Sequence, residues 1–291
     1  MHKGIKNYLC GMEVRPKKAL GQHFLRDSSV ASRIVKSLSL EQAPGGKDRI
    51  PVVEVGPGTG VLTGLLLEDP RIDYHAVELD REATAFLRQK HPLLGSRLTE
   101  GDFLKLPGSA FPGTFYVIGN FPYNISSQIF FRILDLRDAV PQVVGMVQKE
   151  VAERFCAAPG SRTYGILSVL LQTWYRTQYL FTVPPGAFFP PPKVHSGVIR
   201  LERNERTELE CSEDLFLKVV KTTFNQRRKT IRNSLKPLLG DKKMASSGLT
   251  DLRPEQLSVA QFIQLTKETA SVLNAGSSPL RDSSLRPAGM E

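Results

Sequence analysis

The residues from Asn120 to Tyr123 read Asn-Phe-Pro-Tyr, a combination suited to the methylation of an exocyclic amine. The amine of adenine is a poor nucleophile because its lone pair is delocalised into the ring. The side-chain oxygen of Asn120 and the carbonyl of Phe121 could accept both amine hydrogens and favour a pyramidal nitrogen. Pro122 would keep that carbonyl in place, and Tyr123 could stack on the purine face. The tetrapeptide therefore predicts an amine-methylating loop, with an ordinary turn as the alternative.

A glycine loop precedes this tetrapeptide in the chain. The apolar run 51–55 contains β-branched residues and leads into Gly56, Gly58 and Gly60, after which 61–67 has the pattern of a helix. Glycines allow the backbone to turn sharply and to approach a ligand closely. Because the spacing is G-x-G-x-G and not the G-x-G-x-x-G of dinucleotide binding, we expect a bound nucleoside without a pyrophosphate.

Two carboxylates follow at the expected ends of the next two strands. Glu78 ends the apolar run 72–77, about 20 residues past the glycines, where a carboxylate can accept both hydroxyls of a ribose. Asp80 is a nearby competitor, but its place before a helical pattern at Arg81 indicates a helix cap. Asp102 follows a third short run and could accept the amine of a bound nucleobase. Considered alone, Asp102 would be a turn or cap residue.

These motifs, taken in chain order, predict an α/β fold with a Rossmann-like sheet, mostly parallel and doubly wound. The nucleoside loop, the ribose acceptor, the base acceptor and the amine-methylating loop would then meet at the carboxyl ends of the strands. After a charged linker at 202–213, helical patterns at 215–223, 227–239 and 259–269 predict a small all-helical domain. The arrangement resembles a class I S-adenosylmethionine methyltransferase.

Longer motifs extend this resemblance over most of the chain. In chain order they are Lys18–Leu25, the glycine loop, Asn120–Tyr123, Gln148–Val151, Tyr164–Ser168, Phe188–Val194 and Phe224–Leu235. With these motifs the chain resembles the 16S ribosomal RNA adenine N6-dimethyltransferases of the KsgA/RsmA type, from about Lys17 to about Leu265.

The resemblance implies transfer of four methyl groups from S-adenosyl-L-methionine to two adjacent adenosines in the 3′-terminal hairpin loop of 16S rRNA, in the small (30S) ribosomal subunit. The product would be S-adenosyl-L-homocysteine, no metal would be needed, and the protein would also contribute to ribosome biogenesis. The implied cofactor contacts are His23, Leu25, Gly56, Gly58, Glu78, Asp102 and Asn120. The family often has Asn at the position of His23. Because histidine also donates or accepts a hydrogen bond, we expect that contact to survive.

The segment Phe188–Val194 is a second candidate for contact with the substrate, because its consecutive prolines stiffen the loop. The family pattern makes Phe188 the expected partner of Tyr123 around a flipped adenine. Phe189 replaces a residue that is often small, and a core position is its alternative. Lys193 could meet a phosphate. The implied catalytic residues are Asn120, Phe121, Pro122, Tyr123 and Phe188.

The charge distribution agrees with an RNA partner. The chain holds 39 Lys plus Arg against 29 Asp plus Glu, for a net charge of +10. Residues 1–33 contain seven basic and two acidic residues, and residues 218–243 contain nine and one. These stretches together carry +13, so the rest of the chain is slightly acidic, at −3. Such concentration argues for basic surfaces with a purpose.

In Phe224–Leu235 the apolar residues recur at helical spacing, which would let Arg228 and Arg232 share a face and reach successive phosphates. We expect at least two members of the basic set in this motif to touch RNA, the alternatives being a solvated helix face or pairing within the fold. Together with Lys193, the predicted RNA-binding residues are Arg227, Arg228, Lys229 and Arg232. The expected domains are a catalytic domain with a basic N-terminal arm (1–202), a helical RNA-binding domain (203–275) and a disordered tail (276–291).

Cys10, Cys156 and Cys211 are far apart and lack C-x-x-C spacing, so neither a zinc site nor a disulfide framework is predicted. There is no signal peptide and no apolar run of ~18 residues, which favours a cytoplasmic protein with no membrane contact. A monomer is expected. Two other functions stay open: a non-enzymatic small-subunit assembly factor, and a 23S rRNA adenine methyltransferase of the resistance type. The arginine-rich motif Phe224–Leu235 argues against the second.

Overall fold

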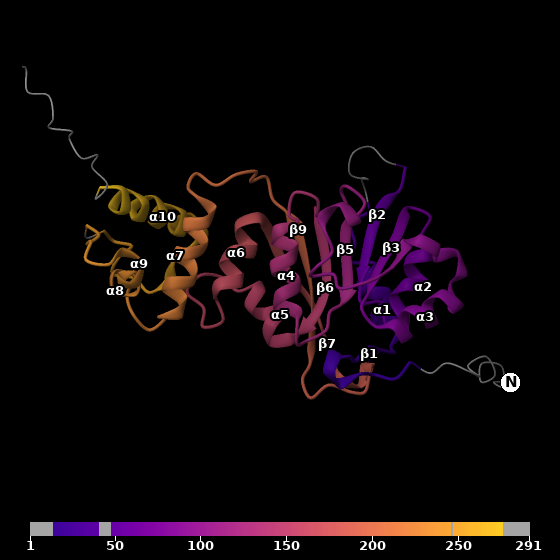
Figure 1. The fold of residues 1–291 in the computed structure, drawn as a ribbon. Helices are drawn as coiled ribbons and strands as arrows, with labels where there is room; N and C mark the ends of the chain where they lie inside the picture. Colours follow the sequence, from indigo (N-terminus) through magenta and orange to yellow (C-terminus); the bar gives the residue numbers. More distant parts are fainter. Residues whose placement is uncertain (1–13, 41–47, 246, 276–291) are drawn as a thin grey trace, which may run out of the picture. The chain divides into compact units, whose positions relative to one another are not determined.

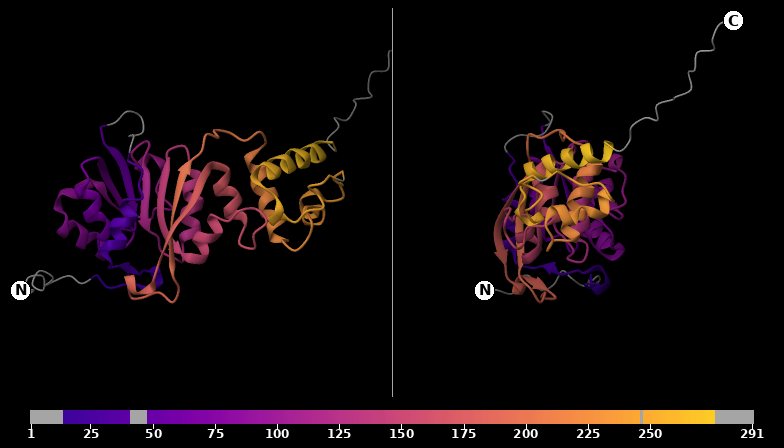
Figure 2. Two further views of the ribbon diagram at one scale, coloured as in Figure 1. Left: turned by 180° about the vertical axis from the view of Figure 1, so that it is seen from behind. Right: turned by 90° about the vertical axis from the view of Figure 1, so that its left-hand side faces the viewer.

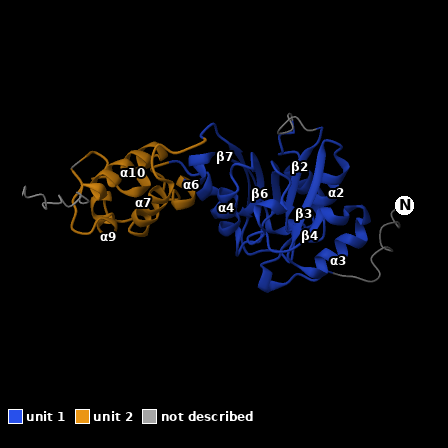
Figure 3. Cartoon of the chain, turned by 45° about the horizontal axis from the view of Figure 1, so that its top comes forward, with its two compact units in different colours: residues 1–158, 170–206 blue, residues 159–169, 207–291 orange. Residues whose placement is uncertain are grey.

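The computed structural model describes residues 14–40, 48–245 and 247–275 of the 291-residue chain. The chain divides into two compact units, one of residues 1–158 and 170–206 and the other of residues 159–169 and 207–291 (Figure 3). The second unit includes the short segment 159–169, which the sequence pattern did not assign to it. The predicted boundary after residue 202 falls inside the last strand of the first unit. The predicted tail, 276–291, lies outside the described residues.

A seven-stranded sheet forms the centre of the first unit, and its order is β4-β3-β2-β5-β6-β9-β7. Neighbouring strands are parallel from β4 to β6, and β9 runs antiparallel to both β6 and β7. The prediction of a mostly parallel, doubly wound α/β fold is confirmed. The strands are β2 (Ile50–Val55), β3 (Ile72–Glu78), β4 (Leu98–Glu100), β5 (Tyr116–Asn120), β6 (Gln142–Gln148), β7 (Tyr175–Val183) and β9 (Ser196–Arg203).

Helices connect the parallel strands on both faces of this sheet. From β2 the chain winds through α2 and α3 to β4, whereas from β5 it winds through α4 in the opposite direction to β6. Right-handed crossovers therefore place α2 and α3 on one face and α4 on the other. Figure 1 shows the helices packed along the strands, and Figure 2 gives two further views. The helices are α1 (Ser28–Val35), α2 (Val61–Glu68), α3 (Arg81–Lys90), α4 (Ser126–Asp135), α5 (Lys149–Phe155) and α6 (Ile166–Trp174), with 3-10 turns η1 (Lys18–Leu20), η3 (Pro92–Arg97), η4 (Gly108–Ala110) and η5 (Pro185–Ala187).

The winding direction changes between β2 and β5, and the carboxyl ends of the strands at such a point form a binding crevice. Strand β2 is buried along its whole length because both of its faces are covered. Asp80 starts α3 by accepting a hydrogen bond from the N–H of Glu82 at 3.0 Å, so the predicted cap is confirmed. The burial of β2 and the cap of α3 therefore hold these two elements in place at the crevice.

A two-stranded ribbon joins the N-terminal arm to the proline-rich loop. Strand β1 (Phe24–Leu25) pairs antiparallel with β8 (Phe188–Phe189). In this register Leu25 lies opposite Phe188, and Phe24 lies opposite Phe189. Directly opposed side chains lie on the same face of an antiparallel pair. Leu25 and Phe188 both belong to the hydrophobic core.

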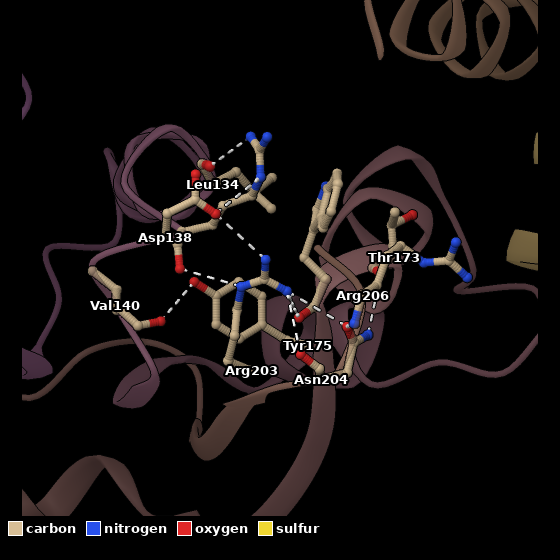
Figure 4. A network of polar contacts seen from close by, with 10 residues as sticks. Leu134, Asp138, Val140, Thr173, Tyr175, Arg203, Asn204 and Arg206 are labelled. Atoms are coloured by element: carbon tan, nitrogen blue, oxygen red, sulfur yellow. Dashed lines mark hydrogen bonds and ion pairs between the residues drawn. The ribbon is translucent and has the colours of Figure 1, made fainter. Parts of the chain in front are cut away.

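A polar network ties the end of β9 to the loop that follows α4 (Figure 4). Arg203 donates a hydrogen bond to the carbonyl of Arg137 at 3.2 Å, and its guanidinium lies 3.5 Å from a carboxylate oxygen of Asp138. The hydroxyl of Tyr175, at the start of β7, donates to the carbonyl of Val140 at 3.0 Å. These bonds fix the antiparallel edge of the sheet.

The second unit is helical, but its middle part differs from the sequence prediction. The continuous helix expected over 227–239 is wrong, because two short helices occupy this stretch. The N–H groups of Ile231 and Arg232 donate to the carbonyls of Leu252 and Thr250 at 2.8 and 2.9 Å, so tertiary bonds replace helical ones. The helical elements that follow α6 are α7 (Glu213–Asn225), α8 (Ile231–Ser234), α9 (Lys236–Leu239), the 3-10 turn η6 (Pro254–Gln256) and α10 (Val259–Asn274). None of the helices in the described part of the chain is long and apolar enough to cross a membrane.

Candidate functional site

A cavity of about 140 Å³ lies in the first unit, at the carboxyl ends of β2, β3 and β5 and at the loop after β4. It brings together most of the predicted site residues. Those that line it are His23, Gly56, Gly58, Glu78, Asp102, Asn120, Phe121, Pro122 and Tyr123. Leu25 lines instead a smaller cavity of about 30 Å³, which shares Gly56, Gly58 and Asn120 with the larger one. Phe188 is not among the lining residues of either cavity.

The glycine loop after β2 is held against the carboxylate at the end of β3. Gly58 has a φ of 56°, in the left-handed region that favours glycine, and a Cβ there would lie 3.0 Å from the ring of Phe24. The N–H of Gly58 donates to Glu78 Oε2 at 2.9 Å, over a separation of 20 residues. The loop and the carboxylate therefore form one rigid wall of the cavity.

Glu78 is 5% exposed, and the N–H of Asp80 donates to its Oε1 at 2.9 Å. Burial raises the pKa of Glu78, against the lowering effect of the N–H groups of Asp80 and Gly58. Each carboxylate oxygen accepts one backbone hydrogen bond and keeps a lone pair for a further donor. This side chain can accept vicinal hydroxyl groups, and the ribose contact stays a prediction.

Asp102 lies at the next wall of the cavity, in the loop after β4. Its Oδ1 accepts a hydrogen bond from the N–H of Leu104 at 3.0 Å, and its Oδ2 lies 3.6 Å from Lys105 Nζ. The side chain is 25% exposed. Asp102 therefore closes a turn and also presents a carboxylate to the cavity, and its contact with a nucleobase stays a prediction.

The N-terminal arm is clamped onto this wall by Asp80, a contact that the sequence did not reveal. Lys17 Nζ lies 2.6 Å from Asp80 Oδ1, and Gln22 Nε2 donates to Asp80 Oδ2 at 3.1 Å. Burial opposes ionisation of Asp80, but the hydrogen bonds from Lys17 and Gln22 lower its pKa. Since Gln22 precedes His23, the clamp positions the part of the arm that lines the cavity. The only local signal was the position of Gln22 inside the long motif Lys18–Leu25.

The arm in turn orients Asn120. The side-chain nitrogen Nδ2 of Asn120 donates to the backbone carbonyl of His23 at 2.8 Å, across 97 residues. Because a carbonyl can only accept, the NH₂ group must face His23, and Oδ1 is left as the free acceptor of the amide. A lining residue with a fixed acceptor is what the amine-methylating hypothesis requires.

Phe121 anchors the loop that follows Asn120. Its ring is 1% exposed, and its centroid lies 5.6 Å from that of Phe130. A Cβ on Gly145 of β6 would come 2.4 Å from this ring, so the neighbouring strand must carry glycine there. The N–H of Phe121 donates to the carbonyl of Met146 at 3.0 Å. With ring and N–H both fixed, the carbonyl of Phe121 is held next to Asn120.

Tyr123 presents its ring to the cavity and is held at both ends. Its hydroxyl forms a 2.5 Å hydrogen bond with Ser196 Oγ, which is fully buried at the start of β9. Its ring centroid lies 5.3 Å from that of His23. The Nδ1–H of His23 donates to the carbonyl of Pro190 at 2.8 Å. Ser196 was not predicted, because nothing in its local sequence indicates a partner 73 residues away.

The two aromatic residues of β8 differ in exposure from what the sequence suggested, because the residue expected at the substrate is buried and the residue with a core position as its alternative is exposed. Phe188 is 4% exposed and packs in the core, whereas Phe189 is 45% exposed. Successive residues of a strand point to opposite faces, and the pairing with β1 turns Phe188 inward. Phe188 therefore packs in the core and lines neither cavity, and its expected pairing with Tyr123 around an adenine stays a prediction.

The predicted RNA-binding residues of the second unit fall into two groups. Arg227 donates to the carbonyl of Ser161 at 3.3 Å and lies 3.6 Å from Glu255, while Arg232 lies 2.8 Å from Asp251. Both are thus paired within the fold. Arg228 and Lys229 are exposed and have no recorded ion pair in the described part of the chain, and the same holds for Lys193 of the first unit. The loop before α8 separates Arg228 from Arg232, so these two do not share one helix face.

Within the described residues, no cluster of three or more His, Cys, Asp or Glu side chains could hold a metal ion. Cys156 and Cys211 form no disulfide bond within the described residues, and Cys10 lies outside them. The groups that line the cavity include the oriented amide of Asn120, the ring of Tyr123 and the carboxylates of Glu78 and Asp102.

Sequence comparisons relate the chain to known proteins. The family described as "Ribosomal RNA adenine dimethylase" matches residues 14–271. The "Ribosomal RNA small subunit methyltransferase A" of Parabacteroides distasonis is 57% identical over 87% of this chain and 93% of its own length. The protein of the same name from Porphyromonas gingivalis is 54% identical over 88% of this chain and 98% of its own.

Two solved structures share the fold. A dimethyladenosine transferase from Plasmodium falciparum superimposes with a TM-score of 0.69, at 23% identity, over 86% of this chain and 98% of that one. The 23S rRNA methyltransferase ErmE superimposes with a TM-score of 0.59, at 25% identity, over 84% and 99%.

Proposed function

Because the chain belongs to the ribosomal RNA adenine dimethylase family, we propose that it methylates two adjacent adenosines in the 3′-terminal hairpin loop of 16S rRNA. The protein is an rRNA adenine N6-dimethyltransferase, and four methyl groups convert the two amines into dimethylamines. The proposed methyl donor is S-adenosyl-L-methionine, the product is S-adenosyl-L-homocysteine, and the proposed partner is the small (30S) ribosomal subunit or its precursor.

The observation that carries this proposal is the orientation of Asn120. Its Nδ2 is occupied by the carbonyl of His23, so Oδ1 is free to accept one hydrogen of an exocyclic amine. The carbonyl of Phe121 can accept the other hydrogen. Two acceptors on one amine draw the nitrogen lone pair out of conjugation and toward the methyl donor. Tyr123 supplies a ring for stacking, while a similar role for Phe188 would require that ring to leave the core.

The remaining walls of the cavity offer contacts for the proposed donor. Glu78 would accept the ribose hydroxyls, and Asp102 would accept the amine of the base. Gly56 and Gly58 would let the backbone come close to the donor. Leu25 and His23 would contact the donor beside these glycines. When bound, S-adenosylmethionine supplies an activated methyl on a sulfonium with a good leaving group. The chain itself then needs to align two groups, and strong acid or base catalysis is not required.

We assign RNA positioning to basic side chains that are free to meet phosphates. Arg228, Lys229 and Lys193 are exposed, and such cations fix register and make binding depend on salt. Arg227 and Arg232 are already paired, so we expect them chiefly to hold the helical unit together. The helical unit is the proposed RNA-binding domain, and the protein is proposed to act as a cytoplasmic monomer. A stable dimer in analytical ultracentrifugation would contradict the monomer.

The proposed function is tested by nucleoside mass spectrometry on undermethylated small subunits incubated with the full chain and S-adenosylmethionine. Wild type should form dimethyladenosine. Asn120→Ala should form none, while Gln89→Ala, which removes an exposed amide on α3, should behave like wild type. If wild type binds subunits but forms no product, the protein acts as an assembly factor.

The shared fold with ErmE makes large subunits the necessary second substrate in this assay. Product on 23S rRNA and none on 16S rRNA would assign the resistance-type activity. An Asn120→Ala variant that still restores ribosome assembly in cells lacking the native protein would show that subunit binding has a role separate from methylation.

A further inference from the structure

Beside the methylation cavity, Phe189 and Arg26 form a small exposed surface, here called the β8 platform. Lys193 and Val194 are exposed further along the same loop. Phe189 is 45% exposed and Val194 is 44% exposed. Only two other large hydrophobic side chains in the described residues are comparably exposed, Leu79 and Leu93. Phe189 therefore offers exposed apolar surface beside a cation, and the loop that follows it carries a second cation and, five positions after Phe189, a second exposed apolar side chain.

The platform is adjacent to the cavity because of strand pairing. Phe189 lies opposite Phe24, and directly opposed residues share a face of the ribbon. Phe24 lines the cavity, and so does His23, whose Nδ1–H donates to the carbonyl of Pro190. Phe24 of β1 thus connects the cavity to the platform, and Pro190, which follows Phe189, is hydrogen-bonded to a residue that lines the cavity.

The chemistry of the platform is that of a stacking site with a cation. The guanidinium carbon of Arg26 lies 3.9 Å from the centroid of the Phe189 ring. Arg26 is exposed, and no ion pair to it is recorded in the described part of the chain. A ring with a fixed orientation and a neighbouring positive charge matches a nucleobase and its phosphate.

We propose that the β8 platform binds the unpaired nucleobase next to the adenosine that occupies the cavity. This inference rests on the proposed function. Extruding one nucleotide of a hairpin loop breaks its stacking with the neighbour, and an exposed aromatic at the rim restores stacking for that neighbour. Two adjacent adenosines are methylated, so while one of them reacts in the cavity, the other would lie on the platform or at its edge. Arg26 and Lys193 would meet the phosphates on either side.

The test compares variants of Phe189 in steady-state methylation of undermethylated small subunits. Phe189→Ala should raise KM for the subunits about tenfold, as expected for the loss of one base–aromatic stack. The kcat should change little, because the stack is present in both the ground state and the transition state. Phe189→Tyr should stay within about twofold of wild type.

Phe189→Leu is the matched control for packing. It keeps apolar volume but removes the aromatic face, so stacking predicts the high KM of Phe189→Ala, whereas a purely structural role predicts wild-type behaviour. Arg26→Gln should raise KM by a few fold and make binding less dependent on salt. Thermal unfolding and S-adenosylmethionine binding are measured for each variant and should match wild type.

The outcomes separate the two proposals. An active wild type with unchanged KM in Phe189→Ala and Phe189→Leu would overturn the platform and leave the proposed function intact. An inactive wild type on both ribosomal subunits would overturn the proposed function and the platform with it. If Phe189→Ala does not fold, Phe189→Leu decides alone.

Discussion

Glu54 offers a direct test of the physical description of the sheet. It lies in the middle of β2, is 2% exposed, and its Oε2 accepts hydrogen bonds from Thr63 Oγ1 and the hydroxyl of Tyr74, both at 2.7 Å. Burial raises the pKa of Glu54 to about 7, against the lowering effect of these two hydroxyls. The ordinary value is 4.5, which the unfolded chain should show.

The sign of the pH dependence follows from these two pKa values. Between pH 4.5 and about 7 the folded protein holds a proton on Glu54 that the unfolded chain has released. The free energy of unfolding contributed by this group therefore falls as pH rises through that interval. At about 1.4 kcal/mol per pH unit, the loss between pH 5 and pH 8 is about 2 to 3 kcal/mol.

The perturbation is Glu54→Gln, which keeps an acceptor oxygen for Thr63 and Tyr74 but cannot ionise. Urea unfolding of wild type and variant is measured at several values between pH 5 and pH 8. The difference in unfolding free energy, variant minus wild type, should increase by about 2 to 3 kcal/mol over this range. Taking the difference removes the contributions of all other groups that titrate.

Glu68→Gln is the control, because it makes the same exchange at the exposed end of α2. A difference for Glu54→Gln that stays constant with pH would refute the reasoning. It would mean that Glu54 is ionised in the folded protein throughout, or that water reaches its carboxylate.

Three further predictions concern the site and its RNA contacts. Tyr123→Phe and Ser196→Ala each remove one partner of the same hydrogen bond, and each should reduce kcat/KM by up to about tenfold. The double variant should be no worse than either single one. Additive losses in kcat/KM would show that Ser196 does not act through Tyr123. Asp80→Asn should loosen the N-terminal arm and weaken S-adenosylmethionine binding, measured by calorimetry, by about tenfold. Glu82→Gln is the control, because it removes only the exposed carboxylate that lies 3.2 Å from Lys17, and it should have little effect on binding. Equal effects of the two variants would exclude a special role for Asp80. Arg228→Ala and Lys229→Ala should each reduce, by about 1, the magnitude of the slope of log RNA affinity against log salt concentration. Arg232→Ala should instead lower thermal stability, because Arg232 is paired with Asp251. An unchanged slope in the first two variants would show that the RNA binds elsewhere.

Several predictions held because they depend on neighbouring residues in the chain. The glycine loop, the carboxylate of Glu78 at the end of β3 and the cap of Asp80 all follow from a strand, a turn and a helix in succession. The order of these units and the right-handed crossover between them bring their carboxyl ends to one edge of the sheet. The fold class and the cavity wall could therefore be predicted from local patterns.

Other features could not, because residues far apart in the chain decide them. The helix expected over 227–239 is interrupted since Ile231 and Arg232 find carbonyl partners at Leu252 and Thr250. The inward turn of Phe188 and the exposure of Phe189 depend on register with β1, which periodicity alone does not reveal.

By itself the sequence determined which chemical groups this protein carries and which strand ends present them, since those properties belong to short segments of chain. Tertiary structure alone decided how the groups point. The amide of Asn120 is turned by a carbonyl 97 residues away, and Tyr123 is held by a hydroxyl 73 residues away. A hydrogen bond requires its two partners within about 3 Å, and only the packed fold brings such distant residues to that distance.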